Sequence, residues 1–334
     1  MRMQYRFNGS AMRRYNSATR GIAFLSSRSA SAASIISIRT HCVRKETMVI
    51  VDTHVHVFTD DRKKYPQLID TPRAGSIPSI TEIGQTPWPV TTVETLATLM
   101  DEAGIDKATL VQAYFVYEYD NSYTCDAARL DPKRFASVVV LDPLDPKSPD
   151  ELSRLVEQEG VTGMRFMRGR LPQTSLGEPA TFPLWERMEK LNIPLAINDR
   201  IIELPKIRKA TEKYPDVKVC FEHAWGHKTG LPPYPDLAPL FSFADNPNVY
   251  VKTAINNIAA ARDAGGTAEA LYEKLVQTFG AKRIMWSSNY PAHPKFNGMK
   301  SRLDEAKKVL AFLSEEDRRW IFGETALSVF PGLR

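Results

Sequence analysis

The sequence predicts a single (β/α)8 barrel over residues 48–334, and three observations lead to this prediction. Short apolar runs of strand length recur roughly every 30 residues along this part of the chain. Most of the intervals between them carry the spacing of an amphipathic helix. Strand alternating with helix implies right-handed βαβ units and a parallel sheet, and eight units over this length fit a closed barrel better than two open sheets.

The elements follow in order along the chain. The expected strands are residues 48–51, 108–111, 136–141, 163–166, 194–197, 217–221, 249–251 and 284–286. Helical periodicity is clearest over 93–100, 152–159 and 268–279, a closing helix is expected over 302–313, and a terminal packing segment over 315–330. The segment 59–91 contains five prolines and is too long for a plain connection, so we expect it to fold over the mouth of the barrel.

The composition of residues 1–47 differs from that of the expected barrel and indicates a leader segment. They hold nine Lys/Arg and a single acid, Glu46, which leaves 35 basic and 38 acidic residues in the rest. The Arg- and Ser-rich composition is typical of an organelle transit peptide, although Met48 opens directly into the first strand and translation starting there explains the same pattern. The two readings predict a mitochondrial and a cytoplasmic protein, respectively; the cytoplasmic one is our prediction.

Composition excludes several classes of protein. The basic charge belongs to the leader, and no basic stripe with interleaved aromatics follows Met48, so nucleic-acid binding is not expected. No apolar run approaches the roughly 18 residues of a membrane span. The three cysteines, Cys42, Cys125 and Cys220, are far apart and lack a CxxC spacing, which argues against a cysteine metal site and for a reducing compartment. A homodimer is compatible with such a barrel.

The most informative motif is Asp-Thr-His-Val-His at 52–56, directly after the first apolar run. Side chains two residues apart on a strand point to the same face, so His54 and His56 are expected to converge. Two converging imidazoles supply half of a typical zinc site. A pair of ordinary polar residues at a strand end is the alternative interpretation.

Other histidines follow later strands of the expected barrel. His223 and His227 come after the sixth strand, and His293 after the eighth. Chemistry in such barrels sits at the carboxyl ends of the strands, where these residues would meet His54 and His56.

These motifs together resemble the amidohydrolase-related (amidohydrolase 2) branch of the amidohydrolase superfamily. The resemblance runs over 48–334 and includes GMRFMRGR from Gly163, EHAWG from Glu222, VYVKTA from Val249, MWSSNYP from Met285 and GETALSVFPGL from Gly323. It implies a (β/α)8 fold and either lactone hydrolysis or non-oxidative decarboxylation. In metal-dependent relatives the ion is held by the strand-one histidines, a later histidine and a strand-eight aspartate, which implies His54, His56 and His223 here.

The chain departs from this pattern at Asn289, which stands where the aspartate is usual. An amide cannot accept a proton from water and is a poorer ligand than a carboxylate. Either a divalent ion such as zinc is held by three histidines, or the site works without metal, as some lactonases of the family do. In the metal-free case His223 is the expected base, His54 and His56 polarise the carbonyl, and Asp52 and Asp199 are reserve candidates.

Substrate-binding residues are expected around the same mouth. Arg165, Arg168 and Arg170 follow each other closely at the end of strand four, and paired guanidinium donors suit a carboxylate. Arg165 and Arg170 are the expected substrate contacts, whereas Arg168 is expected at the surface. The remaining candidates are Trp225, His227, Lys252, Tyr290 and His293, each of which competes with plain packing or a solvated position.

The predicted function is hydrolysis of a lactone or related carboxylic ester of an acidic small molecule by attack of water. A metal-dependent decarboxylase of the same family is the nearest alternative. A small-molecule binding protein that retains the barrel without catalysis is the alternative from another class.

Overall fold

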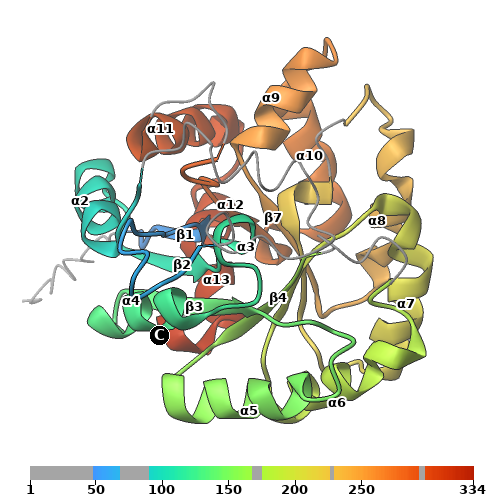
Figure 1. The fold of residues 1–334 in the computed structure, drawn as a ribbon. Helices are drawn as coiled ribbons and strands as arrows, with labels where there is room; N and C mark the ends of the chain where they lie inside the picture. Colours follow the sequence, from blue (N-terminus) through green and yellow to red (C-terminus); the bar gives the residue numbers. More distant parts are fainter. Residues whose placement is uncertain (1–47, 68–89, 168–174, 226–228, 293–297) are drawn as a thin grey trace, which may run out of the picture. The chain divides into compact units, whose positions relative to one another are not determined.

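Eight parallel strands follow one another around a barrel in the computed structural model (Figure 1). The structure describes residues 48–67, 90–167, 175–225, 229–292 and 298–334. The strands are β1 (Val51–Val55), β2 (Lys107–Val111), β3 (Phe135–Val140), β4 (Gly163–Met167), β5 (Leu195–Asn198), β6 (Val219–Phe221), β7 (Val249–Thr253) and β8 (Ile284–Trp286). The sheet order β1 to β8 is the order of the sequence, and the (β/α)8 prediction is confirmed.

The barrel closes between β8 and β1 through the segment that follows β8. Val55 forms a parallel bridge with Tyr290, and the His56 amide donates to the Tyr290 carbonyl at 2.8 Å. The Thr53 hydroxyl also donates to the carbonyl of Trp286, at 2.8 Å. The register of β1 against β2 shifts between Asp52 and Val55, so the first strand is irregular around His54.

Helices surround the strands. They are α2 (Val93–Ala103), α3 (Tyr114–Tyr117), α4 (Ser122–Leu130), α5 (Ser148–Glu159), α6 (Phe182–Leu191), α7 (Leu204–Lys213), α8 (Ala238–Phe241), α9 (Ile255–Asp263), α10 (Ala268–Phe279), α11 (Met299–Val309), α12 (Glu315–Arg319) and α13 (Thr325–Val329). The periodicity at 93–100, 152–159 and 268–279 corresponds to α2, α5 and α10. The closing helix α11 begins three residues earlier than expected.

Local sequence explains where these helices begin and end. Thr92 caps α2 by accepting the Thr95 amide, and Gly104 ends it with φ of 71°, a left-handed conformation that costs glycine little. One face of α2, including Leu96 and Met100, is buried against the barrel. Fully burying an aliphatic side chain of this size contributes about 1.5–3 kcal/mol, so packing outweighs intrinsic helix propensity here.

The inside of the barrel is filled in two layers. The lower one is apolar and contains Val51, Val138, Cys220 and Met285 together with residues of the carboxyl-terminal segment, such as Phe330. The upper one is polar and buried, and holds His54, Arg165, Glu222 and Lys252. The interior thus changes from apolar to polar toward the carboxyl ends of the strands, and the candidate site lies at that end.

The carboxyl-terminal segment closes the lower end of the barrel; the sequence predicted only that 315–330 would pack against it. A π-helical turn, Trp320–Glu324, passes close to the start of β1. A Cβ at Gly323 would lie 2.1 Å from the Val49 carbonyl oxygen, so only glycine fits this approach.

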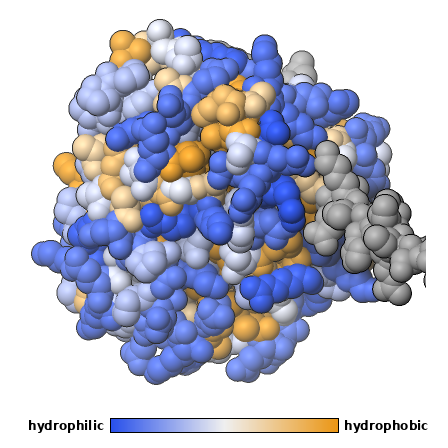
Figure 2. Space-filling model, turned by 180° about the vertical axis from the view of Figure 1, so that it is seen from behind, coloured by the Kyte–Doolittle hydropathy of each residue, from blue (hydrophilic) through white to orange (hydrophobic). Residues whose placement is uncertain are grey.

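No helix among the described residues is both long and apolar enough to cross a membrane. The face seen in Figure 2 is mainly hydrophilic, with hydrophobic side chains in separate groups. Residues 1–47, which hold the expected leader, and most of the proline-rich segment lie outside the described part of the chain.

Candidate functional site

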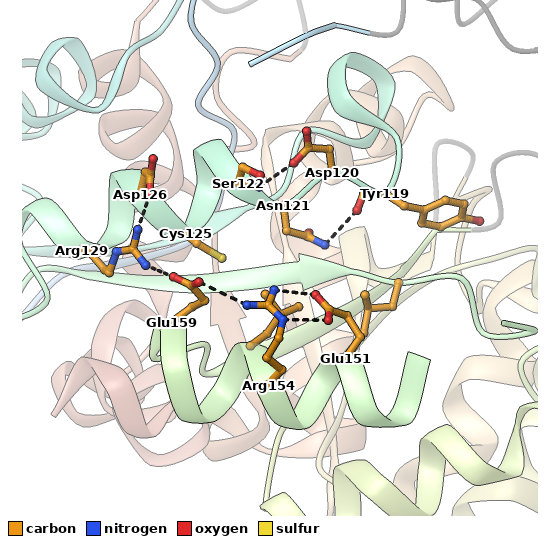
Figure 3. A pocket seen from close by; sticks show the side chains of 12 residues that line it. Tyr119, Asp120, Asn121, Ser122, Cys125, Asp126, Arg129, Glu151, Arg154 and Glu159 are labelled. Carbon is orange, nitrogen blue, oxygen red and sulfur yellow. Dashed lines mark hydrogen bonds and ion pairs between the residues drawn. The ribbon is translucent and has the colours of Figure 1, made fainter. Parts of the chain in front are cut away.

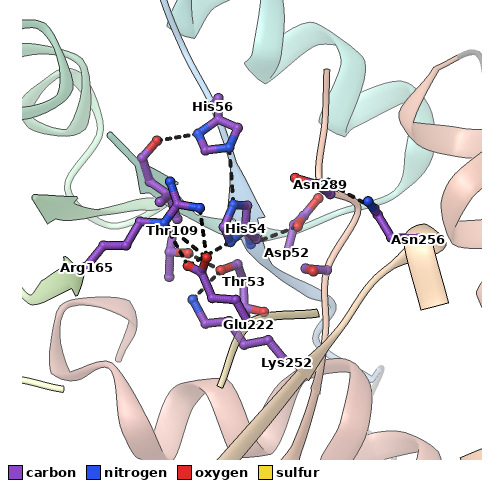
Figure 4. Close-up of polar contacts among 12 residues, drawn as sticks. Asp52, Thr53, His54, His56, Thr109, Arg165, Glu222, Lys252, Asn256 and Asn289 are labelled. Carbon is purple, nitrogen blue, oxygen red and sulfur yellow. Dashed lines mark hydrogen bonds and ion pairs between the residues drawn. The ribbon is translucent and has the colours of Figure 1, made fainter. Parts of the chain in front are cut away.

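Polar residues from four strand ends meet at the upper end of the barrel (Figure 4). His54 comes from β1, Glu222 directly follows β6, Lys252 belongs to β7, and Asn289 lies just past β8. All four are nearly or fully buried. This is the end at which the barrel prediction placed the chemistry.

His54, in β1, and His56, directly after it, converge, as their spacing predicted. The Nε2 atoms of His54 and His56 lie 3.2 Å apart, and the rings meet edge to face with centroids 4.8 Å apart. The ring of Phe115 packs against His56 from the other side, with centroids 5.4 Å apart.

The partners of the other ring nitrogens decide which nitrogen carries the proton. His56 Nδ1 lies 2.8 Å from the Val111 carbonyl oxygen, which only accepts, so Nδ1 donates and Nε2 carries a lone pair. His54 Nδ1 lies 3.2 Å from Glu222 Oε1 without forming a hydrogen bond to it in this geometry. A carboxylate at this distance still favours a proton on Nδ1, which would leave a lone pair on His54 Nε2. Burial lowers the pKa of His56 to about 3 and holds the pKa of His54 well below its usual value, so both rings are neutral near pH 7.

With both protons on Nδ1, the two Nε2 lone pairs face each other at 3.2 Å and repel unless a positive charge lies beside them; with the His54 proton on Nε2, the same contact is a hydrogen bond. The donor set therefore fits a cation that prefers imidazole, such as zinc. Among the described residues, one group of three potential ligand residues has its ligand atoms within 4.8 Å of one another, namely His54, Glu222 and His223. The sequence expected His56 in place of Glu222, so the structure adds a carboxylate to the candidate set.

His223 reaches the site through a strained turn after β6. Its backbone has φ of 53°, and the next residue, Ala224, has φ of 40°. Asn257, at the start of α9, holds this turn: its Nδ2 donates to the His223 carbonyl, and its Oδ1 accepts the Ala254 amide at 2.9 Å. The His223 ring is thereby brought to 4.8 Å from the His54 ring, centroid to centroid.

Arg165 is in the interior, as predicted, but it has a protein partner. Its Nε lies 3.1 and 3.0 Å from the two carboxylate oxygens of Glu222, and its Nη2 lies 2.8 Å from Oε2. Burial alone would raise the pKa of Glu222, but Arg165, His54 and Lys252 together hold it well below the usual value. A salt bridge thus engages the guanidinium that the sequence assigned to a substrate carboxylate, and a substrate contact for Arg165 stays a prediction.

Lys252 lies in the polar layer at the end of β7, and its predicted contact with substrate stays a prediction. It is fully buried, and its Nζ donates to the Thr53 carbonyl at 2.9 Å. The ammonium also lies 5.1 Å from the centre of the Phe330 ring, on the side of the apolar layer. Burial lowers the pKa of Lys252. A lysine at the end of a strand is usually interpreted as solvent-exposed. Whether its side chain points into the barrel depends on the closed barrel, which the sequence does not show.

Asn289 is part of an amide pair. Its Nδ2 donates to Asn256 Oδ1 at 2.9 Å, and its backbone has φ of 54°. Both side chains are more than nine-tenths buried. The carbonyl of Asn289 and that of Ser288 accept from Arg302 Nη1 at 2.9 and 3.0 Å, so α11 fixes the loop that carries the asparagine.

The two reserve carboxylates have local structural partners. Asp52 Oδ1 accepts the amides of His54 at 3.1 Å and Ser288 at 2.9 Å, which ties β1 to the segment after β8. Burial raises the pKa of Asp52 to about 6. Asp199 Oδ1 accepts the Arg200 amide at 2.7 Å after β5. A role as the base therefore has less support for either one than for His223.

Several predicted substrate contacts lie outside the described residues. These are Arg170, His227, His293 and the side chain of Trp225; Arg168, which was expected at the surface, lies outside them too. Tyr290 is described and half-buried, and its ring centre lies 5.3 Å from the Arg302 guanidinium. Its predicted contact with substrate stays a prediction.

Sequence reasoning missed three contributors, Glu222, Asn257 and Arg302. The available signal for Glu222 was its position beside His223 at a buried strand end, where a carboxylate needs a partner. Asn257 and Arg302 gave no such signal, because each acts on backbone carbonyls that are distant in the sequence.

A cavity of about 310 Å³ lies on the flank of the barrel between α4 and α5 (Figure 3). Its charges compensate each other: Arg154 binds both oxygens of Glu151 at 2.8 and 2.6 Å, and Arg129 contacts Asp126 and Glu159. These ion pairs leave it a weaker candidate for chemistry than the histidine site.

The neutral state of His56 predicts a pH-dependent stability. Between pH 6.5 and 3 the unfolded chain binds a proton at this position that the folded protein does not, so the free energy of unfolding falls as the pH falls. In chelator-treated protein the wild type should lose about 2 kcal/mol more than His56→Gln between pH 6.5 and pH 5. Denaturant unfolding at both pH values measures this, and equal losses would show that His56 is protonated in the fold.

Comparison with known proteins supports the architecture. The amidohydrolase family model matches residues 51–332. A candidate 2-pyrone-4,6-dicarboxylic acid hydrolase from Pseudomonas putida is 20% identical, with a TM-score of 0.66 over 85% of this chain and 98% of that one. An amidohydrolase from Burkholderia multivorans with bound zinc is 15% identical, with a TM-score of 0.66 over 85% and 99%.

A third structure, 2,6-dihydroxybenzoate decarboxylase from Rhizobium, is 17% identical, with a TM-score of 0.59 over 85% of this chain and 98% of that one. At these identities the likenesses concern the fold. None of the curated proteins compared with the chain matches it. The family model, in contrast, covers most of the sequence and agrees with the order of motifs along the barrel. The chain therefore belongs to the amidohydrolase family.

Proposed function

We propose that this protein is a hydrolase that opens a lactone, or a related carboxylic ester, of an acidic small molecule by attack of water. The observation that carries the proposal is the pair of neutral imidazoles of His54, in β1, and His56, directly after it, with Nε2 atoms 3.2 Å apart, beside the ring of His223. The pair could hold a cation that polarises a carbonyl, and His223 could accept a proton within the same site. The coarser assignment, to the hydrolases and decarboxylases of the amidohydrolase family, rests on the family match.

The charge around the histidines favours an anionic substrate. Arg165, Lys252 and Arg302 are buried there, and two buried carboxylates, Glu222 and Asp52, accompany them. Because the pKa of Asp52 is raised to about 6, its negative charge is the more easily lost of the two. In the sequence, Arg170 follows β4 closely and is a further predicted contact for an anionic substrate.

The reaction needs one proton to move twice. His223 takes a proton from water as the water oxygen bonds to the ester carbonyl carbon, and the bond from that carbon to the ring oxygen then breaks. The same proton passes to the departing alkoxide, so His223 returns to its neutral state. The Nε2 lone pairs of His54 and His56 cannot donate to the carbonyl oxygen, but they could hold a cation beside it. When bound, a divalent ion supplies Lewis acidity at these nitrogens.

Similar proteins support the substrate class. The Pseudomonas putida structure carries the name of a 2-pyrone-4,6-dicarboxylic acid hydrolase, and such a pyrone is an acidic lactone. The decarboxylase has the lower TM-score of the two, 0.59 against 0.66. In addition, Asn289 weakens the firm metal site that the decarboxylase alternative requires.

The test is a panel of carboxylated lactones and of aromatic carboxylic acids, assayed with the full chain before and after chelation. We expect ring opening of at least one carboxylated lactone and no release of carbon dioxide. Release of carbon dioxide that chelation abolishes would replace the proposal with the decarboxylase. Tight binding of the same compounds without turnover would replace it with a binding protein.

The amide at position 289 predicts a weaker metal site than a carboxylate would give. Asn289→Asp should raise zinc affinity at least about tenfold, because it adds a charged oxygen ligand beside the imidazoles. Competition with a chromophoric chelator measures the affinity. Asn256→Asp is the matched control, since it adds the same charge to the other member of the amide pair; an equal gain there would mean that only the added charge matters.

A further inference from the structure

We propose that Glu222, fixed by Arg165, is a positioning residue that holds His54 in the tautomer whose Nε2 lone pair faces His56. The proposal rests on the proposed function for its catalytic consequence alone, since the tautomer and the metal affinity of the site are properties of the free protein. It gives Arg165 a role different from the substrate contact that the sequence suggested.

The geometry assigns Glu222 to positioning rather than to direct metal ligation. Both of its carboxylate oxygens face Arg165, at 2.8 to 3.1 Å, and Oε1 also lies 3.2 Å from His54 Nδ1 (Figure 4). A carboxylate gripped by a planar guanidinium cannot rotate, so its oxygen stays at the nitrogen of the imidazole. Carboxylates that accept from the outer nitrogen of a ligand histidine set its tautomer in the same way.

The backbone of the same histidine is held independently. The Thr53 carbonyl, which belongs to the peptide preceding His54, accepts from Lys252 Nζ at 2.9 Å and from the Thr109 hydroxyl at 2.6 Å. Strands β2 and β7 thus fix the peptide, whereas β4 and the end of β6 fix the ring. The polar layer under the site therefore fixes both the backbone and the ring of His54.

Stability alone does not account for this ion pair. Arg165 and Glu222 have side chains that are 3% and 0% exposed, and the cost of removing both charges from water offsets most of their attraction. An apolar pair of similar volume would stabilise the barrel as well. What the ion pair adds is a fixed acceptor at His54 Nδ1.

The experiment uses the full chain with ¹⁵N-labelled histidine, after chelation, and compares Glu222→Gln with the wild type. Long-range ¹H–¹⁵N correlation reports the tautomer of each ring, and His54→Gln identifies the His54 signal. We expect the Nδ1–H tautomer in the wild type and a mixture or the Nε2–H tautomer in Glu222→Gln. Zinc affinity, measured by chelator competition, should fall about 10–100-fold.

Glu203→Gln is the matched control, because Glu203 is also buried and ion-paired, with Arg200 at 2.7 Å, but follows β5 at the start of α7. It should leave the tautomer and the zinc affinity of the wild type unchanged. If Glu222→Gln fails to fold because Arg165 is left unpaired, the double variant Arg165→Met/Glu222→Gln removes the uncompensated charge and should show the same altered tautomer.

Two results would overturn the proposal. An unchanged His54 tautomer together with unchanged zinc affinity would mean that Glu222 is structural. Loss of zinc with an unchanged tautomer would mean that Glu222 is itself a ligand. With a lactone that turns over, Glu222→Gln should lower kcat more than it changes KM. Absence of any turnover in the wild type would count against the proposed function but would leave the first two readouts valid.

Discussion

Replacing His54 with glutamine should abolish turnover of any lactone that the wild type opens, with kcat/KM falling about 1,000-fold or more. His54 is the central ring of the site: its Nε2 faces His56, its Nδ1 faces Glu222, and its ring lies 4.8 Å from that of His223. Glutamine keeps a polar group, but it has no ring nitrogen that accepts a proton, and it cannot contact His56, Glu222 and His223 at the same time as the imidazole does. Steady-state kinetics of the purified variant measure the effect.

The control for this variant is His41→Gln, which makes the same replacement in the leader, away from the strand-end motifs in the sequence. It should retain wild-type kcat/KM. Thermal unfolding of His54→Gln separates loss of chemistry from loss of fold. A folded His54→Gln that keeps more than a tenth of the wild-type rate would remove the imidazole pair from the mechanism.

Replacing Arg302 with methionine should lower the free energy of unfolding by about 3–5 kcal/mol. The guanidinium is 2% exposed, and its Nη1 donates to three carbonyls, those of Ser288, Asn289 and Ala292, at 2.6 to 3.0 Å. Methionine fills a similar volume but leaves these acceptors unpaired in the interior, and each unsatisfied group costs about 1–3 kcal/mol. Burial lowers the pKa of Arg302 to about 10, which leaves it charged at neutral pH.

Denaturant unfolding with an unchanged m-value is the measurement for Arg302→Met. Lys300→Met on the same helix is the matched control. Lys300 is 65% exposed and pairs with Asp304 at 2.6 Å, and an exposed pair of this kind contributes less than about 1 kcal/mol. Equal effects of the two substitutions would show that the clamp on the strand-eight loop contributes nothing to stability.

Much of the fold was predictable because it depends on short patterns in the sequence. Most strands contain a short apolar run, and the longer helices repeat a buried face every three or four residues, as in α10 with Leu271, Leu275 and Phe279. Such patterns depend only on residues that are close in the sequence, so they can be recognised before the fold is known. The largest difference is in the first strand, which was expected over 48–51 and spans Val51–Val55; elsewhere the ends differ, as in β6, which begins at Val219 rather than at residue 217.

The site was predictable in part, for the same reason. The His54–His56 pair lies on one strand, and its convergence follows from strand geometry. The absence of a carboxylate at Asn289 is also visible in the sequence. The partners of these residues were not, since Asn256 reaches Asn289 from another βα unit and Val111 reaches His56 from β2.

By itself, the sequence determined the barrel, the order of its units, the family and the residues that carry imidazoles to the mouth. Only the tertiary structure decided that Arg165 grips Glu222, that Lys252 is turned inward onto the Thr53 carbonyl, and that Arg302 clamps the strand-eight loop. These are contacts between charged groups and partners on different strands or loops, and two of them span 57 and 199 residues of chain. A charged residue in sequence looks solvated, and the closing of the barrel brings it to the partner that makes its burial possible.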